Sequence, residues 1–226
     1  MISLGNWEDH LADVTCDAVI TDPPYDDVTH KGAATSSADG QRFDAISYTA
    51  WTPRDVRRFV ESWSPRCRGW MVALTSSGLL NCWQAAYRRV GRYAFAPVAC
   101  VIRGMTVRIV GDGPSSWTVY AMVARPSNRE FATWGTLPGA YVVPRNNTSG
   151  GDGRGKPPCL VQGLVRGYSR AGDRVVDPMC GYASTGVAAL SLGRRFVGSE
   201  RDPSIFAEAA KAIARPQQRD LFMESM

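Results

Sequence analysis

Several residue types that would point to particular protein classes are scarce in this 226-residue chain. Histidine occurs only twice, and the six cysteines form neither a C-x-x-C pair nor a cluster with histidine, so no metal site is expected. No apolar run approaches the roughly 18 residues that span a bilayer, and the acidic N-terminus lacks the features of a signal peptide. These absences predict a soluble cytoplasmic protein with reduced cysteines.

Lysine is almost missing as well. It occurs only at positions 31, 156 and 211, although the chain carries 26 basic residues and a net charge of +5. The positive charge is therefore nearly all arginine, which suits bidentate contacts with phosphate. A GC-rich coding sequence produces the same bias, so charge alone leaves nucleic-acid binding open.

Short apolar runs that alternate with amphipathic helical patterns indicate the fold class. The runs cover residues 17–22, 69–75, 95–103, 117–124, 174–177 and 195–200. Helices are expected to begin at Thr52 and Pro53 and at Asp202 and Pro203, where a capping residue precedes a proline, and another is expected over residues 78–90. The alternation predicts one α/β domain over residues 1–226, with a mostly parallel sheet between helices on both faces.

The stretch "RVVDPMCGYASTGVAALSLGRRFVGSERDP", residues 174–203, has the pattern of a ligand-binding turn. A strand ends at Asp177, a glycine-containing turn leads into a helix of small residues, and a second strand ends at Glu200. A carboxylate in that last position suits the two ribose hydroxyls of a nucleotide-like ligand. An ordinary strand–turn–helix is the alternative, because one glycine-rich turn is a weak signal.

The stretch "VITDPPYDD", residues 19–27, ends an apolar run on a carboxylate, two prolines and an aromatic residue. Asp22 and the carbonyl of Pro23 can accept both hydrogens of an amino group, and the prolines offer no competing donor. Tyr25 supplies a flat face for an aromatic base, which would reach it only after leaving a base stack. The alternative is a Pro-Pro turn that ends a strand beside a surface tyrosine.

The two motifs together, in this order, resemble the permuted β-class of DNA amino-methyltransferases that use S-adenosylmethionine. The segments "LGNWEDHL" (4–11) and "KPPCLVQGLV" (156–165) add to the resemblance. It implies a single Rossmann-like methyltransferase domain with a mostly parallel, seven-stranded sheet. It also implies S-adenosylmethionine as the cofactor, no metal ion, and a bacterial or phage-infected cell as the setting.

The resemblance assigns roles to individual residues of this chain. The implied catalytic residues are Asp22, Pro23, Pro24 and Tyr25. The implied cofactor contacts are Asn6, Asp22, Lys156, Pro157, Asp177, Met179, Gly181, Ser184, Thr185, Glu200 and Arg201.

Three residues of the cofactor turn depart from the family pattern. Met179 replaces the usual phenylalanine, Tyr182 replaces a serine, and Ala183 stands where a second glycine is expected. The added Cβ of Ala183 is expected to push the backbone away from the cofactor, and so to weaken binding without abolishing it.

The motif also bears on the substrate. In the family, DPPY accompanies adenine more often than cytosine, which favours methylation of adenine N6 in double-stranded DNA. Methylation of cytosine N4, an RNA target, and a catalytically weak DNA- or nucleotide-binding protein are the alternatives. Cytosine C5 chemistry would need a thiolate such as that of Cys159, but DPPY has no role there. Cys159 is therefore expected to be a packed core residue.

Recognition of DNA is expected from residues 26–50 and 104–155, polar segments that interrupt the alternation of strands and helices. Arginine binds phosphate and guanine, and loop aromatics such as Trp134 and Tyr141 can fill the space left by a flipped base. The candidate DNA contacts are Lys31, Arg42, Arg129, Trp134 and Arg145, with solvated surface side chains as the alternative. A short or loosely specific site is expected. Members of the family serve restriction–modification systems and often dimerise, which leaves a partner nuclease and a homodimer open.

The last residues, 215–226, are expected to form a flexible tail. The run from Gln218 through Asp220, Leu221 and Phe222 resembles the peptide by which bacterial replication proteins bind the sliding clamp. The alternative is that Leu221 and Phe222 fold back onto their own domain.

Overall fold

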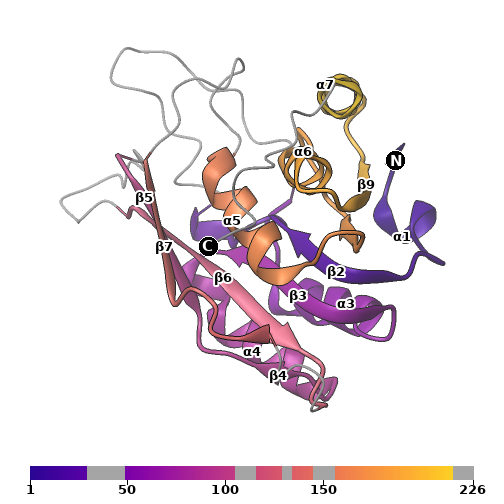
Figure 1. Ribbon diagram of the computed structural model, residues 1–226. Helices are drawn as coiled ribbons and strands as arrows, with labels where there is room; N and C mark the ends of the chain where they lie inside the picture. The colour runs from indigo at the N-terminus through magenta and orange to yellow at the C-terminus, as the bar shows by residue number, and fades with distance from the viewer. Residues whose placement is uncertain (30–48, 105–115, 129–133, 145–155, 216–226) are drawn as a thin grey trace.

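A mixed β-sheet lies between two layers of helices (Figure 1). The computed structural model describes residues 1–29, 49–104, 116–128, 134–144 and 156–215, and within them the sheet has nine strands. Across the sheet the order is β1 (Ile2–Leu4), β9 (Arg195–Glu200), β8 (Arg174–Asp177), β2 (Cys16–Thr21), β3 (Cys67–Thr75), β6 (Thr118–Arg125), β5 (Val98–Arg103) and β7 (Ala140–Pro144), with β4 (Tyr93–Ala94) paired to β6.

The neighbours from β1 through β9, β8 and β2 to β3 all run parallel. Strand β6 is antiparallel to both β3 and β5, and β7 returns parallel to β5. The predicted α/β class with a mostly parallel sheet is confirmed, and each of the six apolar runs overlaps one strand. The seven strands implied by the resemblance are too few, because the short strands β1, β4 and β7 join the six that the apolar runs predict.

Helices cover both faces of the sheet, as predicted. Because side chains alternate along a strand, Ala18 and Ile20 of β2 face one helical layer while Val19 between them faces the other. One layer consists of α1 (Trp7–His10), α3 (Pro53–Trp63) and α4 (Leu80–Arg89), which follows the short 3-10 helix η1 (Ser77–Leu79). The other consists of α5 (Pro158–Tyr168), α6 (Ser184–Ser191) and α7 (Pro203–Ala214).

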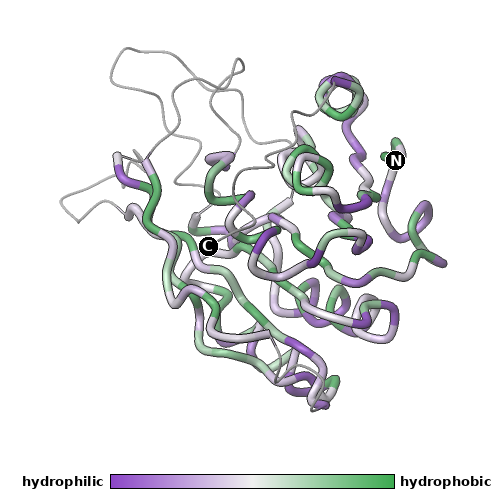
Figure 2. Tube along the Cα trace, in the orientation of Figure 1, coloured by the Kyte–Doolittle hydropathy of each residue, from purple (hydrophilic) through white to green (hydrophobic). Residues whose placement is uncertain are grey.

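The helix starts follow from their capping residues. The backbone amide of Thr52 donates to Asp55 at 2.8 Å, and Pro53 opens α3. Asp202 accepts from the amides of Ser204 and Ile205, and thereby caps α7. Figure 2 shows α3 changing between green and purple along its length, the pattern of a helix with one buried face.

The helices that follow the neighbouring strands β2 and β8 lie on opposite faces of the sheet. After β2, α3 is the first helix that is described over its whole length, and it lies on one face, whereas β8 leads into α6 on the other face. Open α/β sheets have a crevice at the carboxyl ends of two such strands, because the two connections diverge there. The crevice lies between Asp22, which follows β2, and Asp177, the last residue of β8.

The cysteines are all free thiols. Four of them, at positions 16, 67, 100 and 180, are buried as expected of reduced core cysteines, and Cys82 is partly buried. The prediction that Cys159 is a packed core residue is wrong. Cys159 is exposed on the first turn of α5, because Leu160 and Val161 occupy the side of that turn that faces the sheet. Within the described ranges no helix is long and apolar enough to cross a bilayer.

Arg92 is a buried cation that holds the start of β3. Its guanidinium donates to the carbonyl of Gly69 at 2.7 Å, to the carbonyl of Ser64 at 3.0 Å, and to that of Cys67. Arg92→Met would leave these carbonyls without a donor, so we expect the free energy of unfolding in urea to fall by about 2–4 kcal/mol.

Arg89→Met is the matched control for that experiment. Arg89 is 68% exposed and pairs with the carboxylate of Glu61 at 3.4 Å, so a loss below about 0.5 kcal/mol is expected. Equal losses in the two variants would contradict a structural role for Arg92.

Candidate functional site

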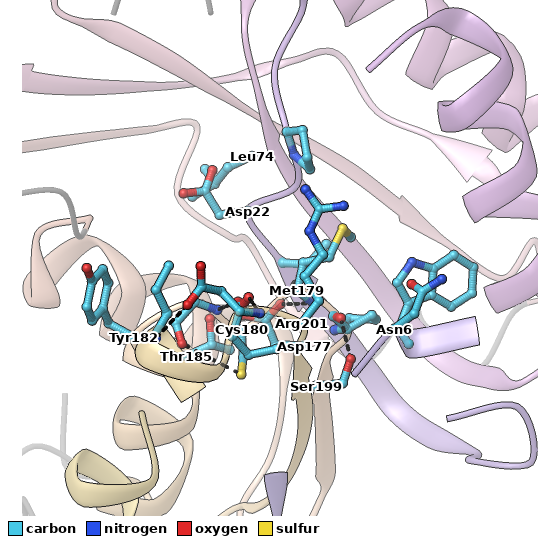
Figure 3. Close-up of a pocket in the computed structure, with 18 of the residues that line it drawn as sticks. Asn6, Asp22, Leu74, Asp177, Met179, Cys180, Tyr182, Thr185, Ser199 and Arg201 are labelled. Atoms are coloured by element: carbon cyan, nitrogen blue, oxygen red, sulfur yellow. Dashed lines mark hydrogen bonds between the residues drawn. The ribbon is translucent and has the colours of Figure 1, made fainter. Parts of the chain in front are cut away.

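A cavity of about 810 Å³ opens at the carboxyl ends of β1, β9, β8, β2 and β3 (Figure 3). Most of the residues predicted for the site line it: Asn6, Asp22, Pro24, Lys156, Asp177, Met179, Gly181, Ser184, Thr185, Glu200 and Arg201. Pro23, Tyr25 and Pro157 do not line it, although Tyr25 contacts Asp22. Segments from both ends of the chain therefore converge on one site.

Asp22 is the centre of a cluster of polar groups at the end of β2. The hydroxyl of Tyr25 donates to Asp22 Oδ1 at 2.8 Å, and Lys156 Nζ donates to Oδ2 at 2.5 Å. The ammonium also lies 5.0 Å from the centroid of the Tyr25 ring. Lys156 is 134 positions from Asp22 in the chain, and its side chain is only 17% exposed. The carboxylate is thus held as an acceptor at a fixed position.

Asp26, which the sequence reasoning missed, ties this loop to the end of β3. Its carboxylate accepts from the hydroxyl of Ser76 and from the amide of Thr29 at 2.8 Å. Although burial alone raises it, these hydrogen bonds hold the pKa of Asp26 below its usual value. A Cβ at Gly78 would lie 2.4 Å from Asp26 Oδ2, so this position accommodates only glycine while Asp26 keeps its place. The one sequence signal for this structural role is that Asp26 directly follows the DPPY motif.

Asp177 lies at the bottom of the cavity and is 2% exposed. It accepts from Thr21 Oγ1 at 2.7 Å and from the amide of Met179 at 3.2 Å. Burial raises its pKa to about 7, against the opposing effect of hydrogen bonds from Thr21 and Thr185, and the nearby charge of Asp22 adds to the rise. The site therefore contains two carboxylates in different electrostatic environments.

The turn after β8 is held in shape by Glu200. The side chain of Glu200 accepts from the amide of Gly181 at 3.0 Å and from the amide of Asp202 at 2.9 Å. Ser199 Oγ donates to the carbonyl of Pro178 at 3.0 Å and joins the same turn to β9. Figure 3 shows Arg201 beside Met179. The turn is pre-organised, and the Glu200 oxygens retain further acceptor sites.

Ala183 occupies a left-handed conformation, with φ of 60° and ψ of 32°, immediately before α6. Its side chain is fully buried and does not line the cavity. The expectation that its Cβ pushes the backbone away from a cofactor therefore has no support in the geometry. The cost of alanine at this position is backbone strain, since the left-handed region is unfavourable for residues with a Cβ.

Asn6 lies where β1 ends, beside the wall formed by α1 and α3. Although it precedes α1, its side chain makes no capping hydrogen bond. Instead Nδ2 donates to Glu8 Oε2 at 3.1 Å, and Glu8 Oε1 pairs with Arg58 at 2.6 Å. Because a carboxylate only accepts, this contact assigns the nitrogen of the Asn6 amide to Glu8 and leaves its oxygen available as an acceptor.

The chemistry of the lining fits a nucleoside joined to an amino acid. Apolar side chains suited to an uncharged ring and thioether include Ile20, Leu74, Val161, Leu164 and Met179. Carboxylates at the strand ends suit hydroxyl and amino groups, and the Lys156 ammonium suits a carboxylate. Among the described residues, no group of three or more His, Cys, Asp or Glu side chains is placed to hold a metal ion.

Of the predicted DNA contacts, Trp134 alone lies within the described residues, and it does not line this cavity. Trp134 packs edge-on against Trp70, with ring centroids 5.5 Å apart, and Arg170 lies 4.7 Å from its ring, beyond the far end of α5. Tyr141 is buried beneath α5, so the expectation that it is available to DNA is wrong. Lys31, Arg42, Arg129 and Arg145 lie outside the described residues, as do Gln218, Asp220, Leu221 and Phe222 of the tail.

Ala183→Gly tests the backbone strain at the turn. Glycine adopts the left-handed conformation without a Cβ penalty, so we expect the free energy of unfolding to rise by about 0.5–1 kcal/mol. Ala207→Gly is the control, because Ala207 is an exposed residue within α7. There we expect a loss of about 1 kcal/mol. Destabilisation of both variants, measured by urea unfolding, would show that Ala183 is not strained.

Asp177→Asn tests the buried carboxyl through pH. The pKa of Asp177 in the folded protein, about 7, lies above the usual 3.8, so the folded state holds the proton more tightly than the unfolded chain. The contribution of Asp177 to the free energy of unfolding therefore falls as pH rises between these two values. An asparagine side chain in its place would keep an acceptor and carry no charge, so we expect a gain of about 1–3 kcal/mol near pH 8 and a flatter profile below pH 7.

The free energy of unfolding of wild type and Asp177→Asn is compared by urea titrations across this pH range. Asp9→Asn, at an exposed position, is the control, and its stability should vary with pH as that of wild type does. An Asp177→Asn protein no more stable than wild type near pH 8 would contradict the assignment.

Comparison with known proteins connects the chain to a family. Residues 125–211 match the N6/N4 DNA methylase family. The type II methyltransferase M.BglI of Bacillus subtilis is 34% identical over 87 residues, which make up 38% of this chain and 25% of that protein. The chain thus matches about a quarter of the length of this relative.

Solved structures extend the similarity of the fold to nearly the whole chain. M1.HpyAVI, solved as a complex with SAM, aligns with a TM-score of 0.67 at 17% identity, covering 94% of this chain and 100% of that one. The cytosine-N4-specific PvuII DNA methyltransferase aligns with a TM-score of 0.65 at 14% identity, covering 93% and 85%. The resemblance drawn from the motifs is therefore confirmed: the chain has the fold of the S-adenosylmethionine-dependent DNA methyltransferases, and its residues 125–211 are related to the N6/N4 DNA methylase family.

Proposed function

We propose that the protein transfers a methyl group from S-adenosylmethionine to the exocyclic N6 amine of adenine in double-stranded DNA, after the base has been flipped out of the helix. The single observation that carries the proposal is the position of Asp22. Its carboxylate lines a cavity of nucleoside size and is held there by Tyr25 and Lys156. The relationship of residues 125–211 to DNA methylases supports the same conclusion.

The cofactor would occupy the cavity and supply an activated methyl group. Glu200 would bind its ribose hydroxyls and Asn6 its adenine, while Lys156 would bind its carboxylate. The apolar side chains of Leu74 and Met179 would contact the rest of the ligand. M1.HpyAVI, which has the same fold, was solved with SAM bound, and this supports the assignment.

Asp22 and the Pro23 carbonyl would accept the two hydrogens of the target amine. An exocyclic amine has its lone pair delocalised into the ring, and two acceptors on its hydrogens favour a pyramidal nitrogen with the lone pair exposed. The nitrogen can then form its bond to the methyl carbon while the bond from that carbon to the sulfonium sulfur breaks and leaves a neutral thioether. The methylated nitrogen releases one proton, which Asp22 is placed to receive. Tyr25, oriented by its hydrogen bond to Asp22, would stack on the flipped base.

Methylation of cytosine N4 is the second candidate, because both bases present an amine of the same geometry. The cytosine-N4-specific PvuII enzyme shares the fold, which supports this alternative. We favour adenine because, in the family that the motifs resemble, DPPY accompanies adenine more often than cytosine.

The test is incubation of the protein with isotope-labelled S-adenosylmethionine and mixed-sequence DNA, followed by digestion to nucleosides and mass spectrometry. We expect labelled N6-methyladenine, whereas labelled N4-methylcytosine would keep the mechanism and change the base. No label on DNA or on RNA would overturn the proposal.

Asp22→Asn separates an enzyme from a binding protein. The change replaces one acceptor by a donor, so we expect the rate of methyl transfer to fall by about 10²–10⁴-fold while the fold is kept. Asp9→Asn, an exposed substitution outside the cavity, is the control and should leave the rate unchanged. Equal rates in the two variants would remove Asp22 from the reaction.

A further inference from the structure

Both oxygens of Asp22 already have donors within the protein. Tyr25 occupies Oδ1 and Lys156 occupies Oδ2, so an incoming amine meets a carboxylate that is partly satisfied. The Lys156 contact is the stronger competitor, because it is an ion pair with a side chain only 17% exposed. Access of the target amine to Asp22 therefore depends on where the ammonium of Lys156 goes.

Lys156 is also the cation best placed for a carboxylate on a ligand. The other cationic side chains that line the described cavity are Arg58 and Arg201. Arg58 is 65% exposed and paired with Glu8, and Arg201 is exposed where β9 ends. The acidic lining residues, which would repel a ligand carboxylate, are Glu8, Asp22, Asp55, Asp177, Glu200 and Asp202.

In S-adenosylmethionine only a short aliphatic chain separates the sulfur from the amino-acid carboxylate. If the methyl group lies within reach of an amine held by Asp22, that carboxylate must lie close to Asp22 too. The ammonium that neutralises Asp22 is therefore the natural partner of the ligand carboxylate as well.

We propose that Lys156 exchanges partners: it pairs with Asp22 while the cavity holds no carboxylate, and with the carboxylate of the cofactor once that ligand is bound. The exchange frees Asp22 Oδ2 to accept the target amine, so that Asp22 becomes a full acceptor only when a methyl donor is present. This inference rests on the proposed function. Coupling of this kind is reciprocal, so an occupied amine site also favours cofactor binding.

The choice of lysine fits an exchange of partners. The chain uses arginine for nearly all its positive charges, yet position 156 is one of only three lysines. A guanidinium would clamp Asp22 through two parallel hydrogen bonds, whereas an ammonium is a compact charge on a flexible stem that can turn from one carboxylate to another.

The first experiment measures binding of two probes by calorimetry: S-adenosylhomocysteine, which carries the amino-acid carboxylate, and 5′-methylthioadenosine, which lacks it. We expect wild type to bind S-adenosylhomocysteine about 10–100-fold more tightly than methylthioadenosine. Lys156→Met should lose most of this preference while its affinity for methylthioadenosine is unchanged. Lys156→Arg, which keeps the charge, should retain a preference of intermediate size.

The second experiment observes the ammonium directly. Reductive methylation with ¹³C-formaldehyde labels the lysines at positions 31, 156 and 211, whose NMR signals can be assigned by lysine-to-arginine substitution. We expect the Lys156 signal to shift in Asp22→Asn, and to shift in wild type on addition of S-adenosylhomocysteine but not of methylthioadenosine. Lys211, which pairs with Glu208 at 2.6 Å on the exposed side of α7, is the internal control and should not move.

The outcomes separate the inference from the proposed function. If both probes bind wild type equally, or if Lys156→Met keeps the full preference, the partner exchange is wrong while the cofactor assignment stands. A Lys156 signal that ignores Asp22→Asn would also overturn the exchange. If neither probe binds wild type, the proposed cofactor is wrong and the inference falls with it.

Discussion

The site depends on two carboxylates that the sheet brings together at the ends of neighbouring parallel strands. Asp22 follows β2 and Asp177 ends β8, and the hydroxyl of Thr21 joins the two strands by donating to Asp177 at 2.7 Å. Among the described residues, α3 and α6 follow these strands on opposite faces of the sheet, and open α/β sheets have a crevice at such a point. Asp177 is buried and Asp22 is paired with a cation, so one backbone arrangement gives two carboxylates different properties.

Much of this arrangement is visible in the sequence, because it is encoded by local patterns. Apolar runs predict the central strands, and a cap followed by proline predicts the starts of α3 and α7. Strand β7 escapes such reasoning because its alternation spans only Ala140–Pro144 within a segment that is otherwise polar. The exposure of Cys159 escapes it too, because the side of a helix that faces the sheet is decided by packing and not by one residue's hydrophobicity.

The residues of the candidate site likewise divide into those that local motifs predict and those that only the structure identifies. The motifs locate Asp22, Asp177 and Glu200 because each ends an apolar run. The sequence does not reveal which groups donate hydrogen bonds to these carboxylates. Thr21 is one residue within an apolar strand, and the contact of Lys156 with Asp22 joins positions 134 residues apart. The sequence marks Ala183 as unusual for a steric reason, whereas the structure gives a conformational reason, a left-handed φ in a buried residue.

The order of the strands in the sheet has a consequence for folding during translation. Strand β8 lies between β2 and β9, yet it follows β2 by about 150 positions in the chain, so this edge of β2 cannot pair with β8 while that stretch is translated. An exposed edge of buried-type residues is a template for pairing with other chains. The nascent chain therefore depends on prompt insertion of β8. A translational pause shortly before Arg174 would prolong the exposure of the β2 edge and so favour aggregation.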